Sequence, residues 1–166
     1  MYSLIVFLPL LGSVLAGLLS LSNRDRAAEL VTVSGLLLSL LLSVFAFAEV
    51  ALGGSAVTVD IGRWISSGGF DARWALRFDT LTAVMLIVVT GVSSMVHIYS
   101  IGYMSHDNAR ARFMSYLSLF TFAMLMLVTA DNLVQLFFGW EGVGVASYLL
   151  IGFWYHKESA HTAAMK

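Results

Sequence analysis

The sequence contains no cysteine among its 166 residues. This absence excludes a disulfide, a zinc site with thiolate ligands, a cysteine-bound iron–sulfur cluster and a thiol nucleophile on these residues. Charge is also scarce, because only 11% of the residues are charged and the formal net charge is −1. With no excess of basic residues, binding to nucleic acid through its phosphates is not expected.

Apolar residues are correspondingly abundant. They make up 59% of the chain, and its mean hydropathy is +0.87, whereas a soluble domain is about 45–50% apolar. A helix needs about 20 apolar residues to cross a bilayer, and five stretches reach or approach that length. The sequence therefore predicts an all-α, polytopic transmembrane bundle, embedded in lipid, with about five spans at residues 2–22, 27–52, 81–101, 113–129 and 133–155.

The long connection at residues 53–80 has a different pattern. Residues 57–61 alternate between apolar and polar, Ser-Ser-Gly-Gly follows at 66–69, and residues 70–76 form a second extended run. Alternation broken by a glycine turn is typical of a hairpin. We expect a short β-hairpin at about residues 57–78 on the outer face, with Trp64 and Trp74 at the level of the lipid headgroups. The alternative is a disordered loop.

The basic residues are divided unequally between the two sides of the predicted bundle. Residues 23–26, 102–112 and 156–166 would face one side and hold six Lys and Arg residues, whereas the opposite side holds three. Because cytoplasmic loops carry the excess of basic residues, we expect the N-terminus outside and the C-terminal segment in the cytoplasm.

Glu141 is the candidate catalytic residue. It follows Leu133 by eight residues, about 12 Å along a helix, so it lies well inside the hydrocarbon. A charge at that depth costs at least about 2.5–3.5 kcal/mol, and such residues usually face a bundle interior or a water-filled path. Its carboxyl group can bind and release a proton, which predicts a proton carrier. The alternative is a protonated glutamic acid that serves only as a hydrogen-bonding link between helices.

The residues around Glu141 are small. Glycines at 139, 142 and 144 make the helix thin, which lets another backbone approach, so we expect Glu141 to be buried in protein rather than exposed to lipid. Gly144 and Tyr148 share its face at i+3 and i+7. Tyr148 is therefore a supporting candidate that can reach Glu141 through one water molecule.

The other ionisable residues lie near the ends of the spans. Solvated ends and helix caps are the expected roles of Asp25, Glu29 and Glu49 and of Asp79 and the Asp131-Asn132 pair. His97, close to the cytoplasmic end of the third span, is a second supporting candidate as a proton relay. An interfacial histidine that contacts headgroups or water is the favoured alternative. The spacing of the histidines predicts no metal site.

Residues 142–147, Gly-Val-Gly-Val-Ala-Ser, resemble a dinucleotide-binding fingerprint. The fingerprint requires a preceding strand and the start of a helix. These residues instead lie within a predicted span, so no NADH binding is expected from them.

Residues 130–157, ADNLVQLFFGWEGVGVASYLLIGFWYHK, resemble the fifth transmembrane helix of an antiporter-like subunit family of respiratory complex I, called subunit L in bacteria and chain 5 in mitochondria. The resemblance extends over essentially the whole chain, through FLPLLGSVLAGLL near the start, RFDTLTAVM at 77–85 and VHIYSIGYMSHD at 96–107. In that family the subunit continues through two inverted repeats of five helices. Residues 1–166 would then be the N-terminal part of a single antiporter-like membrane domain, ending just before the family's sixth helix.

The resemblance implies a membrane-arm subunit of a proton-translocating NADH:quinone oxidoreductase, the NADH dehydrogenase of the respiratory chain. Glu141 would pair with a lysine on a later helix, and this chain would carry neither redox catalysis nor a cofactor or metal. Electron transport would use FMN, iron–sulfur clusters and quinone on other subunits. The expected partners are other complex I membrane subunits, especially neighbouring antiporter-like ones, in a bacterial cytoplasmic membrane in preference to a mitochondrial inner membrane.

Two other functions remain open at this point. A subunit of a sodium–proton antiporter complex would use the same buried carboxylate, and an assembly or anchoring protein would use Glu141 only to join helices. Proton movement driven by NADH oxidation would indicate complex I, whereas proton movement driven by an imposed sodium gradient would indicate the antiporter. Retention of pumping after Glu141→Gln would indicate the second.

Overall fold

The computed structural model describes residues 1–166 and consists mainly of helices. The helices are α1 (Tyr2–Leu21), α2 (Asp25–Phe47), α3 (Thr80–Tyr103), α4 (Arg110–Val128), α5 (Leu133–Ile151) and the short α6 (Glu158–Ala164). A π-helical turn, η1 (Ala48–Leu52), continues α2, and β1 (Val57–Ser67) and β2 (Phe70–Phe78) follow it. The five long helices are each long and apolar enough to cross a membrane, which confirms the predicted all-α bundle of five spans.

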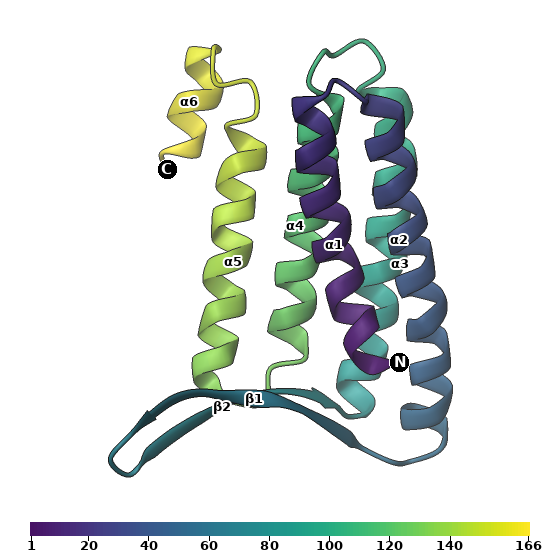
Figure 1. Ribbon diagram of the computed structural model, residues 1–166, viewed down its shortest axis with the longest axis vertical. Helices are drawn as coiled ribbons and strands as arrows, with labels where there is room; N and C mark the ends of the chain where they lie inside the picture. The colour runs from purple at the N-terminus through teal and green to yellow at the C-terminus, as the bar shows by residue number, and fades with distance from the viewer.

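The five long helices run alternately up and down, and α5 lies at one side (Figure 1). Helix α1 packs against α2 and α4, α3 packs against α2 and α4, and α5 packs mainly against α4. The hairpin lies across the end at which α1 begins, while the α1–α2 and α3–α4 turns and α6 lie at the opposite end (Figure 1). We call these the hairpin end and the opposite end.

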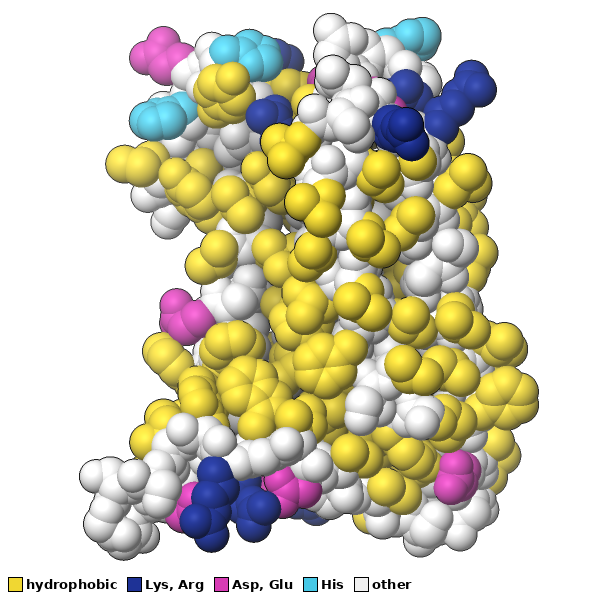
Figure 2. Space-filling view, viewed as in Figure 1, with side chains coloured by type: hydrophobic (Ala, Val, Ile, Leu, Met, Phe, Trp, Pro, Cys, Tyr) yellow, Lys and Arg dark blue, Asp and Glu magenta, His cyan; other side chains and the backbone are white.

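Small and hydroxyl-bearing residues join the helices. Ser13 of α1 and Ser115 of α4 each donate a hydrogen bond to the other's backbone carbonyl, at 2.9 and 2.8 Å. Beside them, Gly12 lies against Thr32 and Ser118. Lipid tails are as apolar as leucine, so close backbone approach and hydrogen bonds hold membrane helices together. The large apolar side chains are left to cover the outside, and most charged side chains lie at the two ends, with an acidic side chain part-way between them (Figure 2).

The hairpin forms where it is predicted. Strands β1 and β2 pair antiparallel from Val57 with Phe78 to Ser67 with Phe70, with two register irregularities in β1. Gly68 in the turn has a φ of 57°, a left-handed conformation that glycine adopts without steric cost. The C-terminal half of β2 is mostly buried and joins the main core through Leu76 and Phe78, while Arg77 between them is exposed.

Two predicted helix boundaries are wrong, and both lie at the opposite end of the bundle. The fourth helix begins at Arg110, three residues earlier than predicted, and Arg110 in its first turn pairs with Asp25 and Glu29 of α2. The fifth helix ends at Ile151 rather than at residue 155, and Gly152 is its C-cap. The chain then turns into α6, which packs back against α5.

Candidate proton site on α5

Helix α5 begins at an asparagine cap. The side-chain Oδ1 of Asn132 accepts a hydrogen bond from the backbone N–H of Gln135 at 3.0 Å. This bond satisfies one of the N–H groups that a helix start leaves unpaired. The predicted cap at Asp131-Asn132 is therefore confirmed, with Asn132 as the capping residue.

Glycines hold α5 close to α4. A Cβ at Gly139 would lie 2.7 Å from the Cα and the backbone N of Leu127, closer than such contacts occur. A Cβ at Gly142 would lie 3.2 Å from the Cβ of Ala123. Gly139 and Ala146 are buried in this contact. Two of the three glycines therefore serve the contact with α4, while Gly144 has open space around it.

Glu141 lies on the opposite side of α5 from this contact. Two residues beyond Gly139 correspond to about 200° of rotation, and the side chain of Glu141 is exposed. Tyr148, 51% exposed, and Gly144 share this open face. None of the four ion pairs of the chain involves Glu141. Within residues 1–166 Glu141 is therefore exposed, because the glycine face of α5 packs against α4 and the glutamate faces away from it. Its burial against later parts of the subunit stays a prediction.

His97 lies in the interior of the bundle, completely buried. Its Nδ1 lies 2.8 Å from the carbonyl oxygen of Ser93, and its Nε2 lies 3.0 Å from the hydroxyl of Ser118 on α4. Because a carbonyl only accepts, Nδ1 carries the proton, and Nε2 of the neutral ring accepts from Ser118. The favoured interpretation of His97 as an interfacial residue is therefore wrong.

The partners of His97 were not singled out from the sequence. Ser93 also hydrogen-bonds to Thr121, so two hydroxyls and the imidazole bridge α3 and α4. A serine four residues before the histidine is the local signal of this arrangement, but Ser118 and Thr121 are distant in the sequence. His97 and Glu141 lie on different helices, and no hydrogen bond connects them.

A partly buried ion cluster links α2 and α4 at the opposite end of the bundle. Arg110 of α4 lies 3.3 Å from Glu29 and 3.5 Å from Asp25, both on α2. Asp25 also accepts the backbone N–H of Ala111 at 3.2 Å. Glu29 is only 6% exposed, so its predicted role as a solvated helix end is wrong. The pairing with Arg110 compensates its burial.

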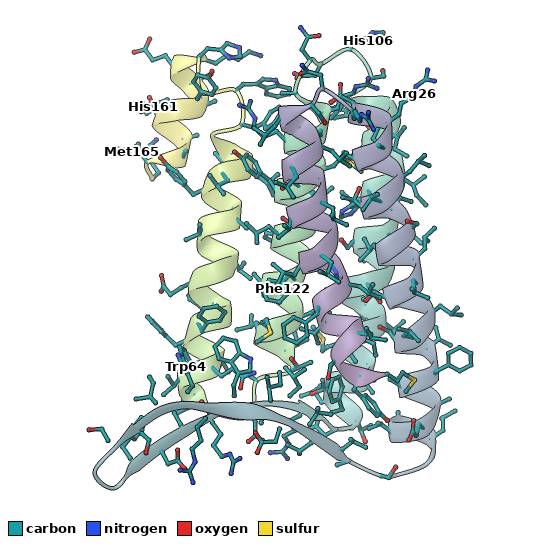
Figure 3. The ribbon with its side chains drawn as sticks, in the orientation of Figure 1. Arg26, Trp64, His106, Phe122, His161 and Met165 are labelled. Carbon is teal, nitrogen blue, oxygen red and sulfur yellow. The ribbon has the colours of Figure 1, made fainter.

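A second link joins two loops at this end. The indole N–H of Trp154 donates to the carboxylate of Asp107 at 2.9 Å, and the N–H of Ala109 donates to the same carboxylate at 2.8 Å. These hydrogen bonds lower the pKa of Asp107 below its ordinary value. Figure 3 shows Arg26, His106 and His161 at the opposite end and Trp64 at the hairpin end. No three His, Asp or Glu side chains lie together as a metal site would require.

Comparison with known proteins identifies the family. Residues 64–114 match the family described as NADH-ubiquinone oxidoreductase (complex I), chain 5 N-terminus. Residues 130–166, which include Glu141, match the family described as NADH:quinone oxidoreductase/Mrp antiporter, TM.

Individual relatives agree with these matches. NADH-ubiquinone oxidoreductase chain 5 of Arabidopsis thaliana is 58% identical over 166 residues, which are all of this chain and 25% of that protein. NADH-quinone oxidoreductase subunit L of Rickettsia typhi is 53% identical over 163 residues, 98% of this chain and 25% of that protein. The chain thus spans about a quarter of the length of these relatives. By these matches the chain belongs to the chain 5/subunit L family of antiporter-like membrane subunits of complex I.

Proposed function

We propose that this chain is part of a proton-translocating subunit in the membrane arm of NADH:quinone oxidoreductase, with Glu141 as its proton carrier. The observation that carries the proposal is the position of Glu141. It is the only charged residue of α5, and it lies in the interior of a 19-residue span. A carboxyl group at such a depth is expensive to keep, and ionisable residues of this kind mark proton and ion pathways.

The open face of α5 suits a carrier that exchanges protons with groups outside these 166 residues. Glu141 forms no ion pair within residues 1–166, so this face is free to meet a cation from another part of the complex. A positive charge close to the carboxylate favours release of the proton, and withdrawal of that charge favours its return. Tyr148 lies on the same exposed face, and in this proposal it donates a hydrogen bond to the carboxylate through a water molecule.

Other subunits would complete the enzyme. In this proposal the complex is a translocase whose FMN, iron–sulfur clusters and quinone lie on other chains, and neighbouring antiporter-like subunits and lipid surround this one. Six Lys and Arg residues at the opposite end and three at the hairpin end support a cytoplasmic opposite end, and so an N-terminus outside. The membrane would be a bacterial cytoplasmic membrane, with the mitochondrial inner membrane as the alternative.

A sodium–proton antiporter subunit is the second candidate, because the family matched by residues 130–166 is named for both kinds of complex. The names of the relatives, chain 5 and subunit L, favour complex I. An imposed sodium gradient that moves protons through the assembled complex without NADH would favour the antiporter instead.

The test uses the full-length subunit in inverted membrane vesicles. Glu141→Gln keeps the shape and the hydrogen-bonding capacity of the side chain but removes its proton-binding group. We expect NADH-driven proton uptake to fall sharply at equal complex assembly, while Asp131→Asn, which neutralises an exposed carboxylate at the hairpin end, leaves it unchanged. Unchanged proton uptake and NADH oxidation in an assembled Glu141→Gln complex would mean that the carboxyl group is structural and the proposal wrong.

A further inference from the structure

Gln135 is a completely buried polar residue in the first turns of α5. Its side-chain Oε1 accepts a hydrogen bond from the backbone N–H of Ala75 in β2 at 3.1 Å. The two residues are 60 positions apart in the sequence, so the bond joins a membrane-spanning helix to the hairpin that lies across its end. A hydrogen bond to a strand backbone fixes both the position of the helix along its axis and its rotation about that axis, relative to the hairpin.

A second hydrogen bond lies one turn earlier. Nδ2 of Asn132 donates to the carbonyl oxygen of Arg73 at 2.7 Å, while Oδ1 of the same side chain caps α5. Phe138 packs against Trp74, with the ring centroids 4.9 Å apart. The hairpin end of α5 is thus attached to three consecutive residues of β2, Arg73, Trp74 and Ala75, by two directed bonds and an aromatic contact.

The rest of α5 is less constrained. Its other contacts are mainly with α4 and α6, and Phe138 also meets Trp64 of β1, with the ring centroids 5.8 Å apart. The glycine contact with Leu127 and Ala123 sets the distance between α5 and α4. A contact made mainly of glycine and backbone atoms offers little resistance to movement of α5 along its axis. At the hairpin end, the attachment to β2 fixes the axial position of α5. Hydrogen bonds of Phe153 and Trp154, just beyond Ile151, hold the other end.

Glu141 follows Gln135 by six residues, which is about 9 Å along the axis and within two helical turns. A helix transmits displacement and rotation over this length almost rigidly, since each residue is hydrogen-bonded to the next turn. If Gln135 moves along or around the helix axis, Glu141 therefore moves by nearly the same distance and angle.

We propose that Gln135 is a positioning residue that sets the depth and rotation of Glu141 by anchoring α5 to strand β2 of the hairpin. The functional part of this inference rests on the proposed role of Glu141. A side chain that only stabilised the helix pair would hydrogen-bond to α4, whereas the amide of Gln135 bonds to β2, and its Nε2 has no partner within the chain.

The experiment compares three variants of the full-length subunit in the assembled complex. Gln135→Leu removes the acceptor and leaves the N–H of Ala75 unpaired. Asn132→Ser keeps an oxygen for the helix cap but loses the donor to Arg73, so it tests the same attachment more mildly. Leu136→Met, an apolar exchange at a partly exposed neighbouring position, is the matched control.

Two quantities are measured in each variant. The first is the rate at which a hydrophobic carbodiimide modifies Glu141, followed by mass spectrometry of the peptide that contains it, which reports the position of the carboxyl group without reference to pumping. The second is proton uptake per NADH oxidised. An ångström of misplacement can cost up to about 100-fold in a step that depends on positioning. We therefore expect at least about a threefold change in both quantities for Gln135→Leu, a smaller change for Asn132→Ser, and none for Leu136→Met.

Each outcome decides the inference. Unchanged labelling of Glu141 in an assembled Gln135→Leu complex overturns it. If that variant does not assemble, Asn132→Ser decides, and wild-type labelling there overturns the inference equally. If Glu141→Gln leaves proton uptake unchanged, the proposed carrier fails, yet altered labelling in Gln135→Leu would still establish that Gln135 positions the residue.

Discussion

Replacing Gly139 by alanine would place a methyl group 2.7 Å from the backbone of Leu127. An ordinary contact at that point is about 3.5–4.0 Å, so α5 would have to move away from α4 by roughly 1 Å. Overpacking of this kind costs about 1–3 kcal/mol. Because the obstruction is backbone, no side-chain rotation can relieve it.

Gly144→Ala is the matched control, because nothing lies within 4 Å of a Cβ at that position. Both substitutions replace a helical glycine with alanine, and each thereby gains about 1 kcal/mol of helix propensity. This gain cancels when the two variants are compared. The difference in their free energies of unfolding then reports the clash alone, and we expect Gly139→Ala to be less stable than Gly144→Ala by about 1–3 kcal/mol.

The assay is denaturation in detergent of a polypeptide of residues 1–166, for which the space around both glycines is known, followed by loss of helical circular dichroism. Gly142→Ala should fall between the other two variants, since its methyl group would meet the Cβ of Ala123 at 3.2 Å, a contact that a small shift relieves. Equal stability of Gly139→Ala and Gly144→Ala would show that α5 does not approach α4 as closely as described, and would refute the reasoning.

Two further predictions concern the opposite end. Because hydrogen bonds lower the pKa of Asp107, the ionised carboxylate stabilises the fold above the ordinary pKa of 3.8, and this stabilisation is lost as the pH falls below it. Trp154→Phe removes the first of these bonds and should flatten the acid side of a curve of stability against pH. A curve identical to that of the wild type would contradict this. Arg110→Met leaves the buried Glu29 without its partner and should lower the free energy of unfolding by about 1–3 kcal/mol. Arg77→Met, in an exposed ion pair, should cost at most about 1 kcal/mol. Equal losses in denaturation would refute the difference.

Much of the fold could be predicted because its causes are local. The thickness of the bilayer dictates the length of each apolar run, so the five spans are visible without knowledge of their neighbours. Strand alternation and the glycine turn predicted the hairpin, and Asn132 predicted the start of α5. The depth of Glu141 follows from counting residues along its own helix. These features depend on the chain's relation to lipid and water rather than on packing.

The identity of the packed faces could not be predicted in the same way. A membrane helix is apolar on every side, so its hydrophobic pattern does not distinguish the face toward protein from the face toward lipid. For this reason the sequence wrongly predicted His97 at the interface and Glu29 in solvent, whereas both are buried. It also did not show that Glu141 faces away from α4. Each reversal depends on contacts between residues far apart in the sequence.

The sequence by itself thus determined the number of spans, the hairpin, the helix cap and the single intramembrane carboxylate, because each follows from short-range geometry and the cost of transfer into lipid. Only the tertiary structure decided that the glycines of α5 face α4, that Glu141 therefore faces outward, and that Gln135 reaches Ala75. Packing between helices in lipid depends on shape and on a few directed hydrogen bonds, and these exist only once distant segments have been brought together.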